Sequence, residues 1–131
     1  MKKLSVKKIA TIILVLSWVG LFVATHIPMP KKLPGMLPSD KHIHYVAYFY
    51  LTMVFIITLK IHKIATWKVI ILALIIMPAY GAFDELTQPL VNRNCEFYDW
   101  FADTIGAITA TGASLIFCVF PKSNSACKPE K

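Results

Sequence analysis

Nine polar residues in three short stretches of the sequence have side chains that could bind a charged ligand or a metal ion. A planar arginine binds phosphate through two parallel hydrogen bonds, and carboxylate oxygens are the ligands that hard divalent cations prefer. An Asp-His pair can also transfer protons. The residue types therefore favour a site for a polar or anionic group, and they leave a metal site open. The nine residues are Asp40, Lys41, His44, Asp84, Glu85, Gln88, Arg93, Asp99 and Asp103.

Helical spacing relates several of these residues to one another. Asp40 and His44 are four residues apart, and Tyr48 continues the same face one turn further along. Asp99 and Asp103 begin a second stripe, which continues through small residues at Gly106, Ala110 and Ala113. Small residues let helix backbones approach closely in lipid. The second stripe is therefore expected to point between helices, with both aspartates directed inward.

The elements that position these residues are predicted to be transmembrane helices. Of the 131 residues, 56% are hydrophobic and only 16% are charged, and the mean hydropathy is +0.60. Four apolar stretches of 17 to 21 residues cover 9–27, 43–59, 64–83 and 100–120, and about 17–25 residues suffice to span a bilayer. We expect an all-α membrane protein, a four-transmembrane-helix up-down bundle in a single domain over 1–131. A disordered chain or a free-standing soluble enzyme is not expected.

The charge distribution predicts how the helices are oriented. The chain carries 14 Lys and Arg against 7 Asp and Glu, a net charge of +7. Most of the lysines flank the two termini and the turn near residues 60–68, whereas most of the carboxylates lie at the other end of the helices. By the positive-inside rule, both termini are cytoplasmic in a multi-pass protein of the cell membrane. The first apolar stretch is longer than a signal-peptide core and is expected to be retained.

The same distribution argues against a nucleic-acid partner, because the basic residues lack interleaved aromatic side chains. The expected partner is the lipid bilayer itself, with an anionic lipid or cell-wall precursor as the ligand. The oligomeric state is left open, and neither a cofactor nor a catalytic residue is predicted.

An up-down arrangement brings the start of the second helix, the end of the third and the start of the fourth to one membrane surface. Ionisable groups at the edge of the hydrocarbon usually face protein or water and pair with one another. For any single residue the alternative is a structural role, such as helix capping or an ion pair of Arg93 with Asp84 or Asp99. The whole set favours an outward-facing pocket for a polar head group. Its predicted residues are Asp40, Lys41, His44, Tyr48, Glu85, Gln88, Arg93, Asp99 and Asp103.

Three segments in order also resemble the VanZ-like family of small bacterial membrane proteins. They are SDKHIHYVAYFYL at 39–51, FDELTQPLVNR at 83–93 and DWFADTIGA at 99–107, within a resemblance covering about residues 25–120. The chain has Asp103 where the family usually has Asn, and it lacks a Pro-Gly before Arg93. The resemblance implies a membrane fold and an envelope role, because the family's named member is associated with low-level teicoplanin resistance. The matching positions are Asp40, Lys41, His44, Tyr48, Glu85, Gln88, Arg93, Asp99 and Gly106.

Three functions are compatible with these residues. The first is a non-enzymatic membrane protein that binds a polar head group through Lys41, His44 and Arg93. The second is a membrane enzyme acting on a lipid-linked phosphate, with Asp40 and His44 as an acid-base pair and carboxylates holding a divalent cation. The third, a transporter, is the weakest, because the centres of the spans are almost entirely apolar. We expect the first.

Overall fold

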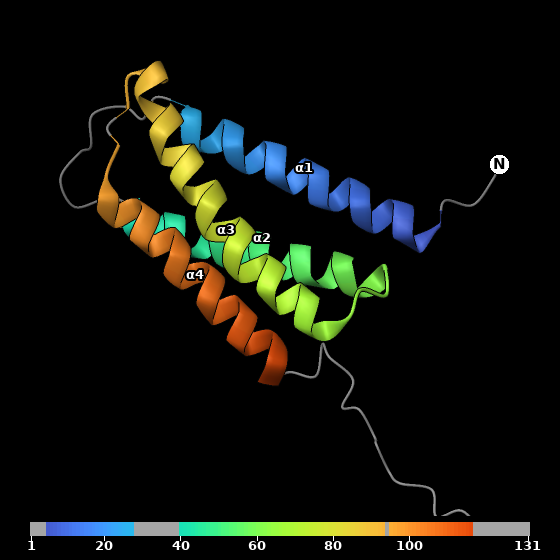
Figure 1. The fold of residues 1–131 in the computed structure, drawn as a ribbon. Coiled ribbons are helices and arrows are strands. Elements are labelled where there is room, and N and C mark those ends of the chain that lie inside the picture. The colour runs from blue at the N-terminus through green and yellow to red at the C-terminus, as the bar shows by residue number, and fades with distance from the viewer. Residues whose placement is uncertain (1–4, 28–39, 94, 117–131) are drawn as a thin grey trace, which may run out of the picture.

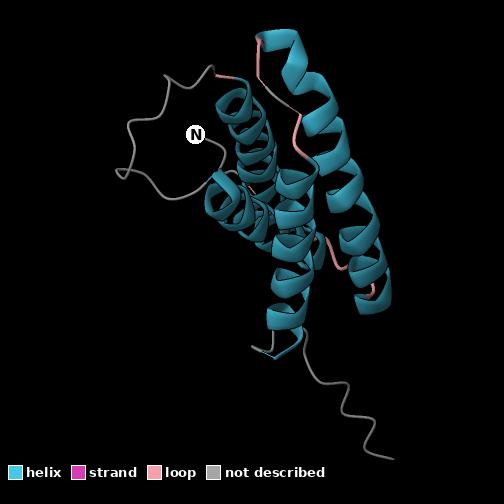
Figure 2. Ribbon diagram, turned by 90° about the vertical axis from the view of Figure 1, so that its left-hand side faces the viewer, coloured by secondary structure: helices cyan, strands magenta, loops and turns pink. Residues whose placement is uncertain are grey.

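The chain is helical throughout the part that the computed structural model describes, which is residues 5–27, 40–93 and 95–116. Figure 1 shows how the helices are arranged, and Figure 2 shows that the described elements are helices joined by short loops. No strand occurs within these residues. The elements in order are α1 (Val6–His26), α2 (Asp40–Ile61), α3 (Thr66–Thr87), the short 3-10 helix η1 (Gln88–Val91) and α4 (Phe97–Ile116).

Three of these helical segments are long and apolar enough to cross a membrane: Val6–His26, Lys41–Ile61 and Thr66–Val91. The shortest two have 21 residues, which corresponds to about 31 Å of helix and matches a hydrocarbon core of about 30 Å. Three of the four predicted spans are thus present as membrane-compatible helices. The fourth predicted span overlaps helix α4, which carries Asp99 and Asp103 but is not among the described helices that are long and apolar enough to cross a membrane. Residues 117–120 of that prediction lie outside the described residues.

The boundary between α3 and η1 follows from Pro89. From the sequence, a third helix that continues past Asp84 is expected to stop before this proline, and α3 does end at Thr87. Proline has no N–H to donate, but it is tolerated in the first turn of a helix. Pro89 accordingly lies at the start of η1, and Asn92, in the left-handed conformation with φ 59°, ends that helix. Glu85 and Gln88 therefore stay on a continuous helical path.

Helix α2 is central to the packing. It contacts α1, α3 and α4, and α3 also contacts α4. Helices α2 and α4 approach closely at Gly106, where an added Cβ would lie 2.5 Å from the backbone oxygen of Tyr45. Only glycine fits there. The apolar core between these helices consists of Leu51, Phe55, Ile56, Val69, Ala73, Met77 and Ala107.

Helix α1 is attached mainly along α2 and exposes most of its apolar surface. Its buried residues are Ala10 and Thr25, one near each end. Near the first end, Thr58 of α2 donates a hydrogen bond of 3.4 Å to the Ala10 carbonyl. Large apolar residues such as Leu16 and Val19 are 66% and 56% exposed, as expected of a helix that contacts lipid rather than water.

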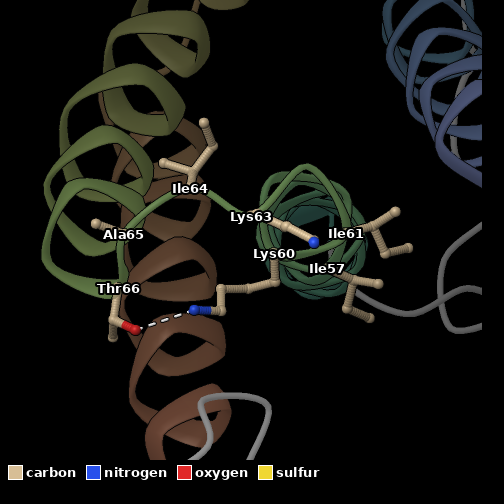
Figure 3. A pocket seen from close by; sticks show the side chains of 7 residues that line it. All are labelled: Ile57, Lys60, Ile61, Lys63, Ile64, Ala65 and Thr66. Carbon is tan, nitrogen blue, oxygen red and sulfur yellow. Dashed lines mark hydrogen bonds between the residues drawn. The ribbon is translucent and has the colours of Figure 1, made fainter.

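The turn between α2 and α3 lies at the opposite end of α2 from His44. Lys63 adopts the left-handed conformation there, with φ 64°. Lys60 donates a hydrogen bond of 3.0 Å from Nζ to Thr66 Oγ1. Figure 3 shows both lysines among apolar side chains around a hollow of about 640 Å³. None of the described residues that line this hollow is a carboxylate.

Candidate functional site

Seven polar side chains from α1, α2, α3, η1 and α4 are buried together with exposed fractions of 8% or less. They lie where α1 and α3 end and where α2 and α4 begin, which we call the cluster end of the molecule. Burying charged groups is costly unless they are paired and hydrogen-bonded, so their partners are described in turn. This buried polar cluster consists of Thr25, His44, Asp84, Glu85, Gln88, Asp99 and Asp103.

His44 is the central residue of the cluster. Its Nδ1 lies 3.0 Å from Asp103 Oδ1, a hydrogen bond between α2 and α4. The same nitrogen lies 3.7 Å from Glu85 Oε1 of α3. All three side chains are almost fully buried. One imidazole nitrogen therefore faces two carboxylates from two other helices.

Glu85 is held in position by two further hydrogen bonds. Gln88 donates from Nε2 to Glu85 Oε1 at 2.9 Å, and the backbone N–H of Glu96 donates to Glu85 Oε2 at 3.0 Å. Glu96 immediately precedes α4, so the Glu85 carboxylate on α3 helps to position the start of α4. Residues on both sides of the α3–α4 connection thereby orient Glu85 toward His44.

Asp84 connects α1 to this arrangement. Thr25 donates from Oγ1 to Asp84 Oδ1 at 2.8 Å, and the carbonyl of Thr25 accepts a hydrogen bond of 2.6 Å from Arg93 Nη1. His26 Nε2 lies 3.0 Å from Thr87 Oγ1. Figure 1 shows the end of α1 close to η1, and the two are in contact. The first helix thus takes part in the cluster.

Lys41 lies at the rim of the cluster and not inside it. Its side chain is 46% exposed, and its Nζ lies 3.2 Å from Glu96 Oε2 and 3.3 Å from Asp99 Oδ1. The same amine lies 5.8 Å from the centre of the Tyr98 ring. Lys41 therefore neutralises the outermost buried carboxylate, Asp99, from the solvent-exposed side.

Several buried oxygens of the cluster have no hydrogen-bond partner within the described part of the chain. They include Asp103 Oδ2, Asp84 Oδ2 and Gln88 Oε1. The hydroxyl of Tyr48, one turn after His44, is also buried without a partner. Such unpaired acceptors are uncommon in folded proteins. The cluster has more acceptors than donors.

A small cavity of about 180 Å³ adjoins the cluster between α1 and α2. Its apolar wall consists of Leu21, Ala24, Ile43 and Ala47, and its polar wall of Thr25, His44, Tyr48 and Arg93. A second hollow of about 410 Å³ runs along the same two helices. The two hollows share Leu21 and Ala47, so they are neighbours along the seam between α1 and α2.

Most of the residues predicted for the site lie at the cluster end. His44, Glu85, Gln88, Asp99 and Asp103 belong to the buried polar cluster, Tyr48 and Arg93 line the adjoining cavity, and Lys41 lies at the rim. The backbone of Asp40 begins α2, but its side chain lies outside the described residues.

Three participants were not predicted for the site: Thr25, His26 and Glu96. Thr25 and His26 lie near the end of the first apolar stretch, and these two polar residues were the sequence signal that α1 contributes to the site. Glu96 contributes its backbone N–H, a contact that residue type does not reveal.

Comparisons with known proteins do not place the chain in a family. No family model matches it, and neither a curated protein nor a solved structure matches it.

Proposed function

We propose that this chain is a multi-pass membrane protein of the VanZ-like type that binds the polar head group of a lipid or lipid-linked cell-envelope precursor without catalysing a reaction. The proposal takes α4 as the fourth span of an up-down bundle. It is supported by three membrane-compatible helices, by two buried carboxylates at the start of α4, and by the three ordered motifs. A role in glycopeptide or envelope-stress tolerance rests on the family resemblance alone.

The observation that carries the proposal is the cavity between α1 and α2. At about 180 Å³ it is smaller than the roughly 300–1,000 Å³ of pockets that enclose whole drug-sized ligands. This volume suits the head group of a lipid. The neighbouring hollow along α1 and α2 is lined by Leu16, Gly20 and Leu51 among others, and it would accommodate the start of an acyl or prenyl chain.

The polar wall of the cavity favours an anionic head group. Arg93 is permanently charged and has donors arranged for phosphate, and His44 and Tyr48 also line the cavity. Among the described residues that line the cavity, none is a carboxylate. The carboxylates lie behind the lining residues, with Asp103 hydrogen-bonded to His44 and Asp84 to Thr25. They hold the lining groups in place.

Native mass spectrometry of the full chain would test this proposal. The protein is released from nanodiscs that contain phosphatidylcholine with either phosphatidylglycerol or a polyprenyl phosphate. We expect retention of an anionic lipid over phosphatidylcholine, and the two arms distinguish an ordinary phospholipid from a precursor carrier. Arg93→Ala is expected to lose the bound lipid while the protein is still expressed.

A pair of neighbouring substitutions on α1 controls for nonspecific effects. Ala24→Phe would fill the cavity without changing a charge, because Ala24 lines it. Val23→Phe adds the same side chain at a position 52% exposed and outside the cavity. We expect only Ala24→Phe to abolish lipid retention. Unchanged retention in both Ala24→Phe and Arg93→Ala would refute the proposal.

The proposed orientation, with the cluster end outward and the termini cytoplasmic, is supported by the positive-inside distribution. Cys95 lies exposed just before α4, at the cluster end. A membrane-impermeant maleimide is expected to label Cys95 in intact cells, and Cys95→Ser should remove that labelling. Labelling of Cys95 only after cell lysis would reverse the orientation.

A further inference from the structure

We propose that His44, Glu85 and Asp103 form a binding site for a divalent first-row transition-metal ion, with Zn²⁺ and Mn²⁺ as the best fit. This inference goes beyond the lipid-binding proposal and does not depend on it. It concerns the centre of the buried polar cluster, behind the cavity wall.

The geometry of the three side chains is close to that of a coordination shell. One ligand atom from each residue lies within 4.8 Å of the other two. His44 Nδ1 is 3.0 Å from Asp103 Oδ1 and 3.7 Å from Glu85 Oε1. Ligands about 2.0–2.2 Å from one ion lie roughly 3.0 Å apart at right angles and about 3.5 Å apart at tetrahedral angles. Small side-chain shifts would therefore place all three around one ion.

The charges and unpaired acceptors at this point favour a cation. Glu85 and Asp103 come from different helices and share one imidazole, and Asp84 and Asp99 are buried in the same cluster. Lys41 compensates only at the rim, through Asp99 and Glu96. Asp103 is fully buried, and its Oδ2 has no hydrogen-bond partner among the described residues. A metal ion would satisfy this oxygen and offset the buried negative charge.

Neighbouring groups also orient the ligand side chains, as the groups around the ligands of a metal site do. Glu85 accepts hydrogen bonds from Gln88 and from the backbone of Glu96. Asp103 Oδ2 is directed toward α3 at Gly81, where an added Cβ would lie 3.1 Å from it. Such outer contacts fix ligand orientation and raise metal affinity. Because Gly81 has no side chain, this residue leaves the Asp103 carboxylate unobstructed.

The donor set selects the kind of ion. One imidazole nitrogen with two carboxylates is softer than the all-oxygen shells of Ca²⁺ and Mg²⁺, and imidazole suits Zn²⁺ and related ions. The buried residues of the cluster, as far as the structure describes the chain, include no cysteine, so the donor set considered is nitrogen and oxygen. The remaining coordination positions would be filled by water or by an oxygen of a bound head group.

The test uses the full chain in detergent, stripped of metal with EDTA and with no lipid phosphate added. Co²⁺ and Mn²⁺ are titrated separately and followed by visible absorption and by electron paramagnetic resonance. We expect saturable binding of one ion per chain. Asp103→Asn and Glu85→Gln keep side-chain shape, and each is expected to weaken binding by about tenfold or more. His62→Ala, at the other end of α2, should leave binding unchanged.

A measurement on the unmutated protein keeps the test independent of variant folding. In protein labelled with ¹⁵N-histidine, Mn²⁺ is expected to broaden the imidazole signals of His44 most strongly and those of His62 least. Absence of saturable binding, or equal broadening of His44 and His62, would overturn the inference. Full binding by a folded Asp103→Asn variant would overturn it as well. Because no lipid is present, failure here leaves the lipid-binding proposal untouched.

Discussion

The close approach of α2 to α4 makes a quantitative prediction at Gly106. A Cβ at this position would lie 2.5 Å from the carbonyl oxygen of Tyr45 and 3.1 Å from the backbone nitrogen of Phe49. Both atoms belong to the α2 backbone, which cannot turn aside as a side chain can. Gly106→Ala therefore requires the two helices to separate near His44 and Asp103.

The expected size follows from two opposing effects. Overpacking a tight contact costs about 1–3 kcal/mol, and a backbone neighbour places Gly106→Ala near the upper figure. Alanine is more favourable than glycine inside a helix by about 1 kcal/mol, which offsets part of that cost. We expect Gly106→Ala to lower the free energy of unfolding by about 2 kcal/mol.

Gly112 in the same helix provides the matched control. An added Cβ there meets no atom within 4 Å, so Gly112→Ala should be neutral or stabilising by up to about 1 kcal/mol. Denaturant titrations in detergent, followed by tryptophan fluorescence, would rank the two variants against the wild type. If Gly106→Ala proved as stable as Gly112→Ala, the close packing of α2 on α4 at this point would be refuted.

Two further predictions concern contacts at the rim and at the end of α1. Thr25→Val removes the hydroxyl that donates to Asp84 Oδ1, and the buried acceptor left behind should cost about 1–3 kcal/mol in the same titration. Thr11→Val, whose hydrogen bonds are exposed, should change stability much less, and an equal loss would contradict the role of Thr25. Lys41→Met removes ion pairs with Glu96 and Asp99, so the stability difference from wild type should shrink as salt is added; a salt-independent difference would argue that packing, not charge, is lost.

Much of the helical framework could be predicted from periodicity and hydropathy. The second predicted span, 43–59, falls inside α2, and the stop before Pro89 was correct. The stripe on the last helix was also informative, because Asp99, Asp103, Gly106 and Ala110 are buried and only Ala113, its last member, is half-buried. These predictions depend on local rules of spacing and backbone chemistry, and a single sequence contains that information.

The partners of each polar residue could not be predicted in the same way. Residue types suggested an ion pair of Arg93 with Asp84 or Asp99, whereas the described contact of its guanidinium is with the carbonyl of Thr25. Lys41 was grouped with the pocket, yet it lies at the rim beside Glu96. Such contacts depend on how far each helix is rotated and how closely it approaches its neighbours.

The sequence by itself determined that the chain forms long apolar helices with carboxylates gathered near one end, because composition and helical spacing are local properties. Only the tertiary structure decided that His44 lies between Asp103 and Glu85, and that α1 completes the cluster through Thr25. The contacting pairs His44–Glu85, His44–Asp103 and Thr25–Asp84 are 41 to 59 positions apart in the chain, and no local rule fixes their separation in space. The close approach of helix backbones at Gly106 brings α2 against α4 and so places His44 within hydrogen-bonding distance of Asp103.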